Sequence, residues 1–190
     1  MLRWIVRALA LIVIAAATLV VLDFAELLVP VGPDDSASMA NTIPACDGRV
    51  LAQGLTYRFT DPSPDDVVAV HAAETDDGVF PDPDADDRTL VLRVVAGPGD
   101  TIVGRAGTVF VNDIKIDDIT TPPFKEVTVP NEQYFLLGDN RTGAIDSRTF
   151  GPVLRDAIFA KVFAVVWPLR DFTFRLGRFT GAPPGPIDCT

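Results

Sequence analysis

The sequence predicts a mostly β protein with one N-terminal helix that spans a membrane. The chain has 16 prolines and 14 glycines, which separate short β-branched runs spaced about every ten positions. No long amphipathic helical period lies between these runs, which disfavours a parallel α/β fold. The segments expected to form strands are 49–52, 66–71, 89–96, 101–105, 109–111, 125–129, 134–137 and 160–166.

The membrane helix is predicted from the uncharged run at 8–22. A helix of that run is about 22 Å long, short of the roughly 30 Å hydrocarbon core, so we expect it to continue to residue 28. Arg3 and Arg7 precede the run and Asp23 and Glu26 follow it. This charge asymmetry places the N-terminus in the cytoplasm and the rest outside, at the cell membrane. A cleaved secretory signal, with the small residues 15–17 at its cleavage site, is the alternative.

The length of 190 residues accommodates one ordinary domain and an appendage. We therefore divide the chain into an anchor at 1–28, an extracytoplasmic β domain at 29–180 and an irregular Pro/Gly-rich tail at 181–190.

Composition excludes several classes of function. The net charge of −10, without any basic cluster, argues against nucleic acid as a partner. One histidine and two cysteines exclude the usual four-ligand zinc site, and no metal or other cofactor is expected. Cys46 and Cys189 could form a disulfide in an oxidising compartment or remain separate thiols.

An acidic segment at 74–88 interrupts the strand pattern. Asp82, Asp84 and Asp86 resemble the start of a calcium loop, but the downstream glycine and glutamate of such a loop are missing. The segment is therefore predicted to be a solvated acidic loop.

Three further segments differ from a generic β protein. The first, 36–43, reads SASMANTI. The second, 92–101, reads LRVVAGPGDT and ends in a Pro-Gly turn. The third runs from Val129 to Val153 and reads GDNRTGAIDSRTFGPV from Gly138 onward.

In this order, the three segments resemble the type I signal peptidases. Members of that family carry S-x-S-M-x-P-T after a membrane anchor, then K-R-V-x-G-x-P-G-D, then G-D-N-R-x-x-S-x-D-S-R-x-F-G. The resemblance extends from the anchor to residue 168 and implies a signal-peptidase-type β-barrel or sandwich domain.

The resemblance also implies a mechanism. Ser38 takes the position of the nucleophile, and a desolvated, neutral lysine would accept its proton. The hydroxyl of Ser36 takes the position that helps to hold the oxyanion. The substrates would be exported precursors whose extended segment pairs with a strand of the site.

Three departures from the family pattern concern residues of the implied site. Leu92 stands where the family has its lysine, and leucine has no lone pair to accept a proton. Ala144 replaces a serine that would orient the lysine, and Asn41 replaces a proline. The other polar residues of the third segment are retained, and we interpret them as a scaffold around the site: Asp139, Asn140, Arg141, Asp146 and Arg148.

Two hypotheses follow. In the first, the chain is non-proteolytic and acts as an accessory or binding subunit of a membrane complex, with membrane or exported proteins as partners. In the second, it is an active signal peptidase with Ser38 as nucleophile, and His71 or an unorthodox group replaces the lysine.

Overall fold

The computed structural model describes residues 4, 7, 9–15, 17–18, 28–30, 37–44, 48–75, 78–85, 88–167, 169 and 173–174. Residues 9–15 are helical. Among the described residues, no helix has both the length and the apolar character needed to cross a membrane. Residues 19–27 of the predicted anchor and the whole predicted tail at 181–190 lie outside the described part of the chain.

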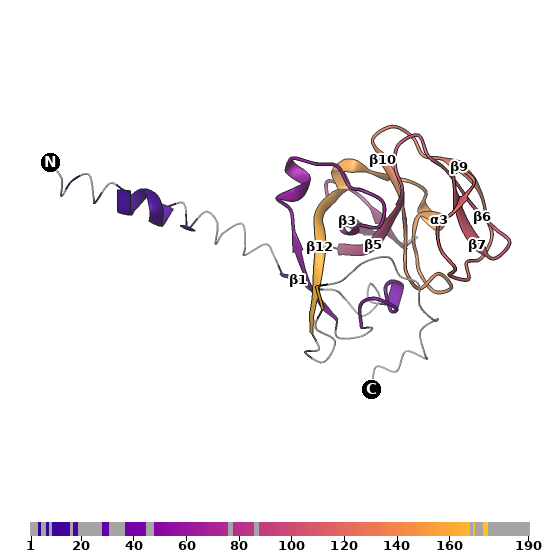
Figure 1. Cartoon of the computed structure of the whole chain (residues 1–190), viewed down its shortest axis with the longest axis horizontal. Helices are drawn as coiled ribbons and strands as arrows, with labels where there is room; N and C mark the ends of the chain where they lie inside the picture. The colour runs from indigo at the N-terminus through magenta and orange to yellow at the C-terminus, as the bar shows by residue number, and fades with distance from the viewer. Residues whose placement is uncertain are drawn as a thin grey trace.

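The protein is mostly β, as predicted, and its strands form two sheets (Figure 1). The larger sheet has eight strands in the order β1-β2-β12-β3-β5-β10-β11, with β4 paired to β3. The smaller has four strands in the order β8-β7-β6-β9. The strands of the larger sheet are β1 (Leu28–Pro30), β2 (Arg49–Gln53), β3 (Val67–Thr75), β4 (Gly78–Pro81), β5 (Arg88–Ala96), β10 (Gln133–Leu137), β11 (Val153–Leu154) and β12 (Ile158–Trp167).

The smaller sheet and three short helical turns complete the described domain. The sheet contains β6 (Thr101–Arg105), β7 (Thr108–Val111), β8 (Ile114–Lys115) and β9 (Phe124–Thr128). The turns are η1 (Thr56–Arg58), α3 (Ser147–Phe150) and η2 (Arg155–Ala157). All pairs between named strands are antiparallel, as expected for strands joined by short turns.

The position of β5 between β3 and β10 explains why its sequence is almost continuously apolar. Val91 packs in one core cluster with Met39 and Ile43, whereas Leu92 packs in a second cluster on the other face of the strand. Farther along β5, Val95 belongs to a third cluster that also contains residues of the smaller sheet. Because both faces of β5 are covered, the alternation typical of a half-buried strand is absent.

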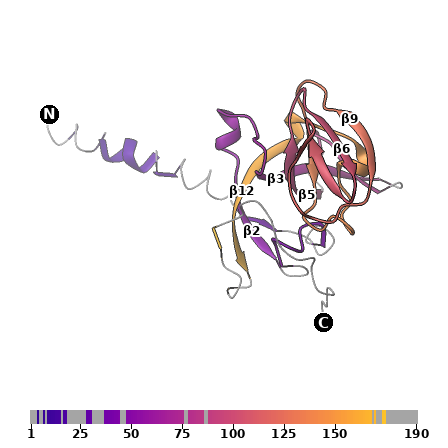
Figure 2. The same cartoon turned by 45° about the vertical axis from the view of Figure 1, so that its right-hand side comes forward.

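Figure 2 shows the smaller sheet lying beside the β5 side of the larger one. The third core cluster joins them, because Ala96 and Phe135 of the larger sheet pack with Ile102 and Val109 of the smaller. The two sheets therefore share apolar side chains, as in a sandwich.

All eight predicted strands are confirmed: the bounds of 101–105 agree, and those of the other seven differ by one to four residues at an end. The prediction that 74–88 is only a solvated loop was wrong, because β3 continues to Thr75 and β4 pairs with it in a hairpin. Gly78 adopts a φ of +126°, which favours glycine, and the apolar Val79 and Phe80 follow it. Beyond the strand, Asp82 Oδ1 accepts from the backbone N–H of Asp84, so this carboxylate closes a turn.

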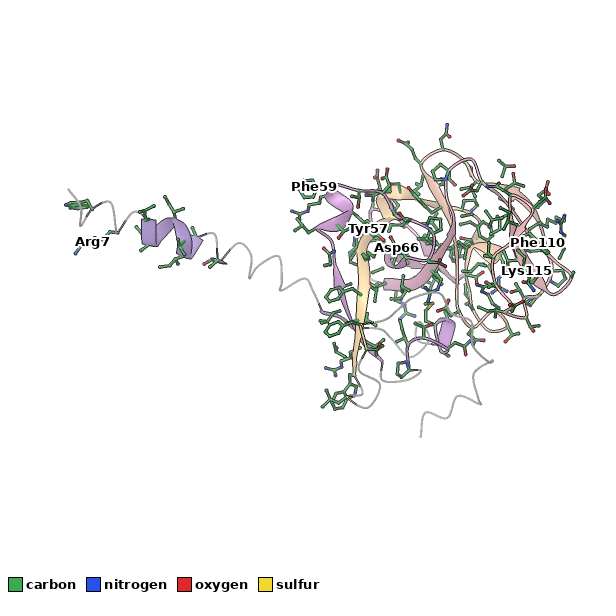
Figure 3. All side chains as sticks on the ribbon, in the orientation of Figure 1. Arg7, Tyr57, Phe59, Asp66, Phe110 and Lys115 are labelled. Carbon is green, nitrogen blue, oxygen red and sulfur yellow. The ribbon has the colours of Figure 1, made fainter. Side chains whose placement is uncertain are left out.

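Both tyrosines of the chain have raised pKa values. Burial is the main cause for Tyr57, and the adjacent Asp66 carboxylate, which accepts from the Tyr57 hydroxyl at 2.9 Å, adds to it. Burial likewise raises the pKa of Tyr134. Figure 3 shows Tyr57 and Asp66 side by side.

We predict that neither tyrosine ionises at its ordinary pKa of 10.0 while the chain is folded. In the unfolded chain both phenols lose their protons near that pH, so stability falls as the pH rises above it. Phenolate absorbance in an alkaline titration should therefore appear together with unfolding. A tyrosine that titrates near pH 10 in the folded protein would contradict this assignment.

Candidate functional site

Ser38 lies on a short turn at 37–43, whose apolar side chains fix it to the larger sheet. Met39 and Ile43 are fully buried and pack with Val67 and Val91. The backbone N–H groups of Thr42 and Ile43 donate to the Met39 carbonyl at 2.7 and 2.8 Å. The residues flanking Ser38 thus determine where its hydroxyl lies, and Ser38 itself is 9% exposed.

The loop that follows β10 holds this turn from its other side. Asn140 donates its backbone N–H to the Ser38 carbonyl at 3.0 Å and its side-chain amide to the Ala37 carbonyl at 3.0 Å. Asn41 returns a bond of 2.9 Å from its amide to the Asp139 carbonyl, and the Thr42 hydroxyl donates to the Asp139 carboxylate. The turn and the loop, about a hundred residues apart in sequence, therefore form one unit.

A buried ion pair between Arg93 and Asp139 fixes this unit to β5. The Nε and Nη2 groups of Arg93 donate to the two carboxylate oxygens of Asp139 at 2.8 and 2.7 Å. The side chains are 3% and 0% exposed, so both charges are desolvated and depend on each other. The third nitrogen of Arg93, Nη1, donates to the Asp65 carbonyl at 2.9 Å.

A second buried pair connects the loop to the segment between β8 and β9. Arg141 Nη2 contacts Asp117 Oδ2 at 2.7 Å, and the two side chains are 2% and 5% exposed. Arg141 also donates to the Gly138 carbonyl and to the Thr121 hydroxyl, at 3.1 and 3.2 Å.

A third ion pair joins Arg148 to Asp146 at the end of the loop. Arg148 donates from Nε and Nη2 to the two oxygens of Asp146 at 2.7 and 2.6 Å. Asp146 also accepts from the backbone N–H groups of Gly138 and Arg148 and so caps α3. The structure thus brings together all five residues predicted as a scaffold: Asp139, Asn140, Arg141, Asp146 and Arg148.

The network also contains residues that were not predicted as part of the scaffold, namely Thr42, Arg93, Asp117 and Thr121. Asp117 lies in an acidic stretch, DIKIDD, in which no local feature distinguishes it from its neighbours. Its role depends on the contact with Arg141, 24 positions later.

The backbone of Ser38 lies against Gly138, which directly follows β10. A Cβ on Gly138 would lie 2.3 Å from the Ala144 Cβ and 2.5 Å from the Ser38 carbonyl oxygen, so only glycine fits. The register pairs Leu136 with Val94 and Leu137 with Arg93.

The side chain of Leu92 is fully buried in the second core cluster, with Val68 and Leu136. The environment is therefore apolar at the position where the family resemblance implies a lysine. Within the described residues the Ser38 hydroxyl has no hydrogen bond to a basic side chain. Our interpretation of Leu92 as the position of a missing base stays a prediction.

The lysines of the chain have other contacts or lie elsewhere. Lys161 Nζ contacts Asp66 Oδ1 at 2.5 Å, and Lys115 pairs with Asp118. Lys125 lies exposed on β9 in the smaller sheet. His71 stacks on Phe159, with ring centroids 4.1 Å apart.

Some predicted residues lie outside the described part of the chain, namely Ser36, Cys46 and Cys189. Their proposed roles, in the oxyanion site and in a disulfide, stay predictions. Asn41 is described, and its Oδ1 is buried without a hydrogen-bond partner in the described structure. Among the described residues no group of three or more potential ligands could hold a metal ion.

Comparison with known proteins identifies the family. The model described as "Signal peptidase, peptidase S26" matches residues 1–167. The chain belongs to the signal peptidase family. This membership confirms the resemblance inferred from the three segments.

Two individual relatives are 31% and 29% identical to this chain over the matched residues. A probable signal peptidase I-2 from Synechocystis sp. is 31% identical over 140 residues, which cover 70% of this chain and 61% of that protein. Signal peptidase I of Leptolyngbya laminosa is 29% identical over 154 residues, 78% of this chain and 71% of that protein. A crystal structure of a signal peptidase I from Enterococcus faecalis matches 52% of this chain and 94% of its own, with a TM-score of 0.41 and 24% identity.

We predict that Asp139→Asn lowers the free energy of unfolding by about 3–5 kcal/mol, because it leaves the Arg93 charge buried without its counter-ion. Denaturant titration of the purified protein measures this change. The matched control is Asp113→Asn, which breaks the exposed pair with Arg105 and should change stability little. Equal effects of the two substitutions would contradict the proposed dependence of the site on the buried pair.

Proposed function

We propose that this member of the signal peptidase family binds extended segments of exported or membrane proteins at the Ser38 turn without hydrolysing them. It would act as an accessory or binding subunit of a membrane complex. The observation that supports this proposal is the fully buried Leu92, at the position where the family resemblance implies the general base. Ser38 and its supporting loop would then serve recognition, with strand pairing as the mode of binding.

The chemical reason is that a serine hydroxyl without an adjacent base is a weak nucleophile. Leu92 cannot accept a proton, and Arg93 remains protonated and is already bound to Asp139. Loss of one member of such a catalytic group lowers turnover by roughly four to six orders of magnitude. Ala144, adjacent to Gly138, supplies no hydroxyl to orient an amine.

We further propose that the protein is attached to a membrane by its apolar run at 8–22, with the β domain on the extracytoplasmic side. The charge flanks of the run favour this orientation. Among its relatives, one is named a thylakoidal processing peptidase and another a mitochondrial inner membrane protease subunit, both from Arabidopsis thaliana. These names are consistent with membrane attachment.

The second candidate function is an active signal peptidase that cleaves signal peptides with Ser38 as nucleophile. Two observations favour it: two of the relatives are named signal peptidases, and hydrogen bonds from Asn140 hold the turn that carries Ser38. This candidate requires a proton acceptor other than a lysine at position 92. His71 is weakly supported, because its ring stacks on Phe159 and not on a residue of the Ser38 turn.

A cleavage assay distinguishes the two candidates. Full-length protein in detergent is incubated with a signal-peptide substrate, and product is compared with that from Ser38→Ala. Our proposal predicts equal, background cleavage by both proteins, together with binding of the intact peptide. Cleavage that depends on Ser38 would contradict the proposal and support the active peptidase.

A gain-of-function variant tests the role of Leu92 directly. Leu92→Lys with Ala144→Ser would supply an amine and an orienting hydroxyl, and we predict that it gains cleavage that depends on Ser38. The matched control is Leu92→Met with Ala144→Ser, which lacks the amine but keeps a long apolar side chain. A folded double variant with no more activity than this control would show that Leu92 alone does not explain inactivity.

A further inference from the structure

A cavity of about 400 Å³ lies away from the Ser38 turn, between η1 and the start of β12. It is lined by Gly54, Tyr57, Arg58, His71, Arg155, Ile158, Phe159 and Ala160. Its volume falls within the range of small-molecule sites, and the proposed function above does not use it.

The lining of this cavity is cationic, although the chain as a whole carries a net charge of −10. It contains the guanidinium groups of Arg58 and Arg155 and no carboxylate. Arg155 is held in place by the carbonyl oxygens of Tyr57 and Ile158 and by Asp61, whose side chain is 79% exposed. Such a positive site in an acidic protein favours an anionic ligand.

His71 gives the cavity an unused polar group. Its half-buried ring stacks on Phe159, and in the described structure neither ring nitrogen has a hydrogen bond. The ring nitrogens are not among the buried polar atoms that lack a partner, so the imidazole is accessible to water or a ligand. The backbone N–H of Asp82 donates to the His71 carbonyl at 3.0 Å.

Apolar side chains flank the cationic residues. Leu55 and Phe59, at the two ends of η1, are 50% and 81% exposed. Figure 3 shows Phe59 at the outer edge of the domain, pointing away from it, while Tyr57 points inward. A ligand that used both features would have an anionic head for the cavity and an apolar part for Leu55 and Phe59.

We propose that this cavity binds the phosphate headgroup of an anionic phospholipid. Guanidinium groups suit phosphate because their planar N–H groups match its oxygen atoms. Arg58 and Arg155 supply the charge, His71 supplies a hydrogen bond, and Leu55 and Phe59 contact the first part of the acyl chains. This inference is independent of whether Ser38 is catalytic.

His71 is the only histidine in the chain, so its imidazole proton resonances report on this cavity alone. Full-length protein in a neutral detergent is titrated with short-chain phosphatidylglycerol, and in parallel with phosphatidylcholine of the same chain length and with glycerol phosphate. We predict a saturable shift with phosphatidylglycerol and binding at least about tenfold weaker for the other two.

Arg58→Gln should weaken binding of phosphatidylglycerol by at least about tenfold, because it removes a charged hydrogen-bond donor to the phosphate. The matched control is Arg105→Gln on the smaller sheet, which should leave the titration unchanged. The lipid assignment is overturned if the resonances do not shift or if glycerol phosphate binds as tightly as the lipid. Equal binding of the zwitterionic lipid, or no effect of Arg58→Gln, would overturn it as well.

Discussion

The buried pair of Arg93 and Asp139 is the interaction on which the candidate site depends. Two desolvated charges are tolerated only because each guanidinium–carboxylate contact is short and well oriented. The pair connects the central strand β5 to the loop after β10, and Thr42 extends that connection to the turn of Ser38. A change in either charge would therefore move Ser38 as well as destabilise the fold.

This arrangement fixes the shape of the site through residues other than the one at position 92. The residues that position Ser38 are Met39 and Ile43 in the core and the Asp139–Asn140 backbone, and none of them takes part in proton transfer. Leu92 lies on the other face of β5 from Arg93 and packs in a separate apolar cluster. A substitution at position 92 would therefore leave the scaffold contacts unchanged.

Much of the fold could be predicted because strand signals are local. Runs such as 89–96 are apolar and bounded by turn residues, and they became strands. The two-residue strands β8 and β11 are too short for a periodic signal, and β4 was hidden by the carboxylates around it. Their formation depends on pairing with β7, β10 and β3.

The site could be predicted only where its residues are close together in the sequence. Asp139, Arg141 and Asp146 could be found because they belong to one contiguous segment with a family resemblance. Asp117 and Thr121 could not, because their role depends on a contact made only when the smaller sheet packs against the larger. The cavity around His71 could not be predicted either, because two of its lining residues, Arg58 and Arg155, are almost a hundred residues apart in sequence.

The pH dependence of Ser38 acylation tests the absence of a base most directly. A small serine-reactive electrophile is applied to the full-length protein, and modification of Ser38 is followed by mass spectrometry across the pH range. Without a base, the rate should be slow and should rise in proportion to hydroxide concentration, without a plateau. A rapid reaction with a titration step near neutral pH, lost in an otherwise folded variant of one nearby residue, would contradict our account.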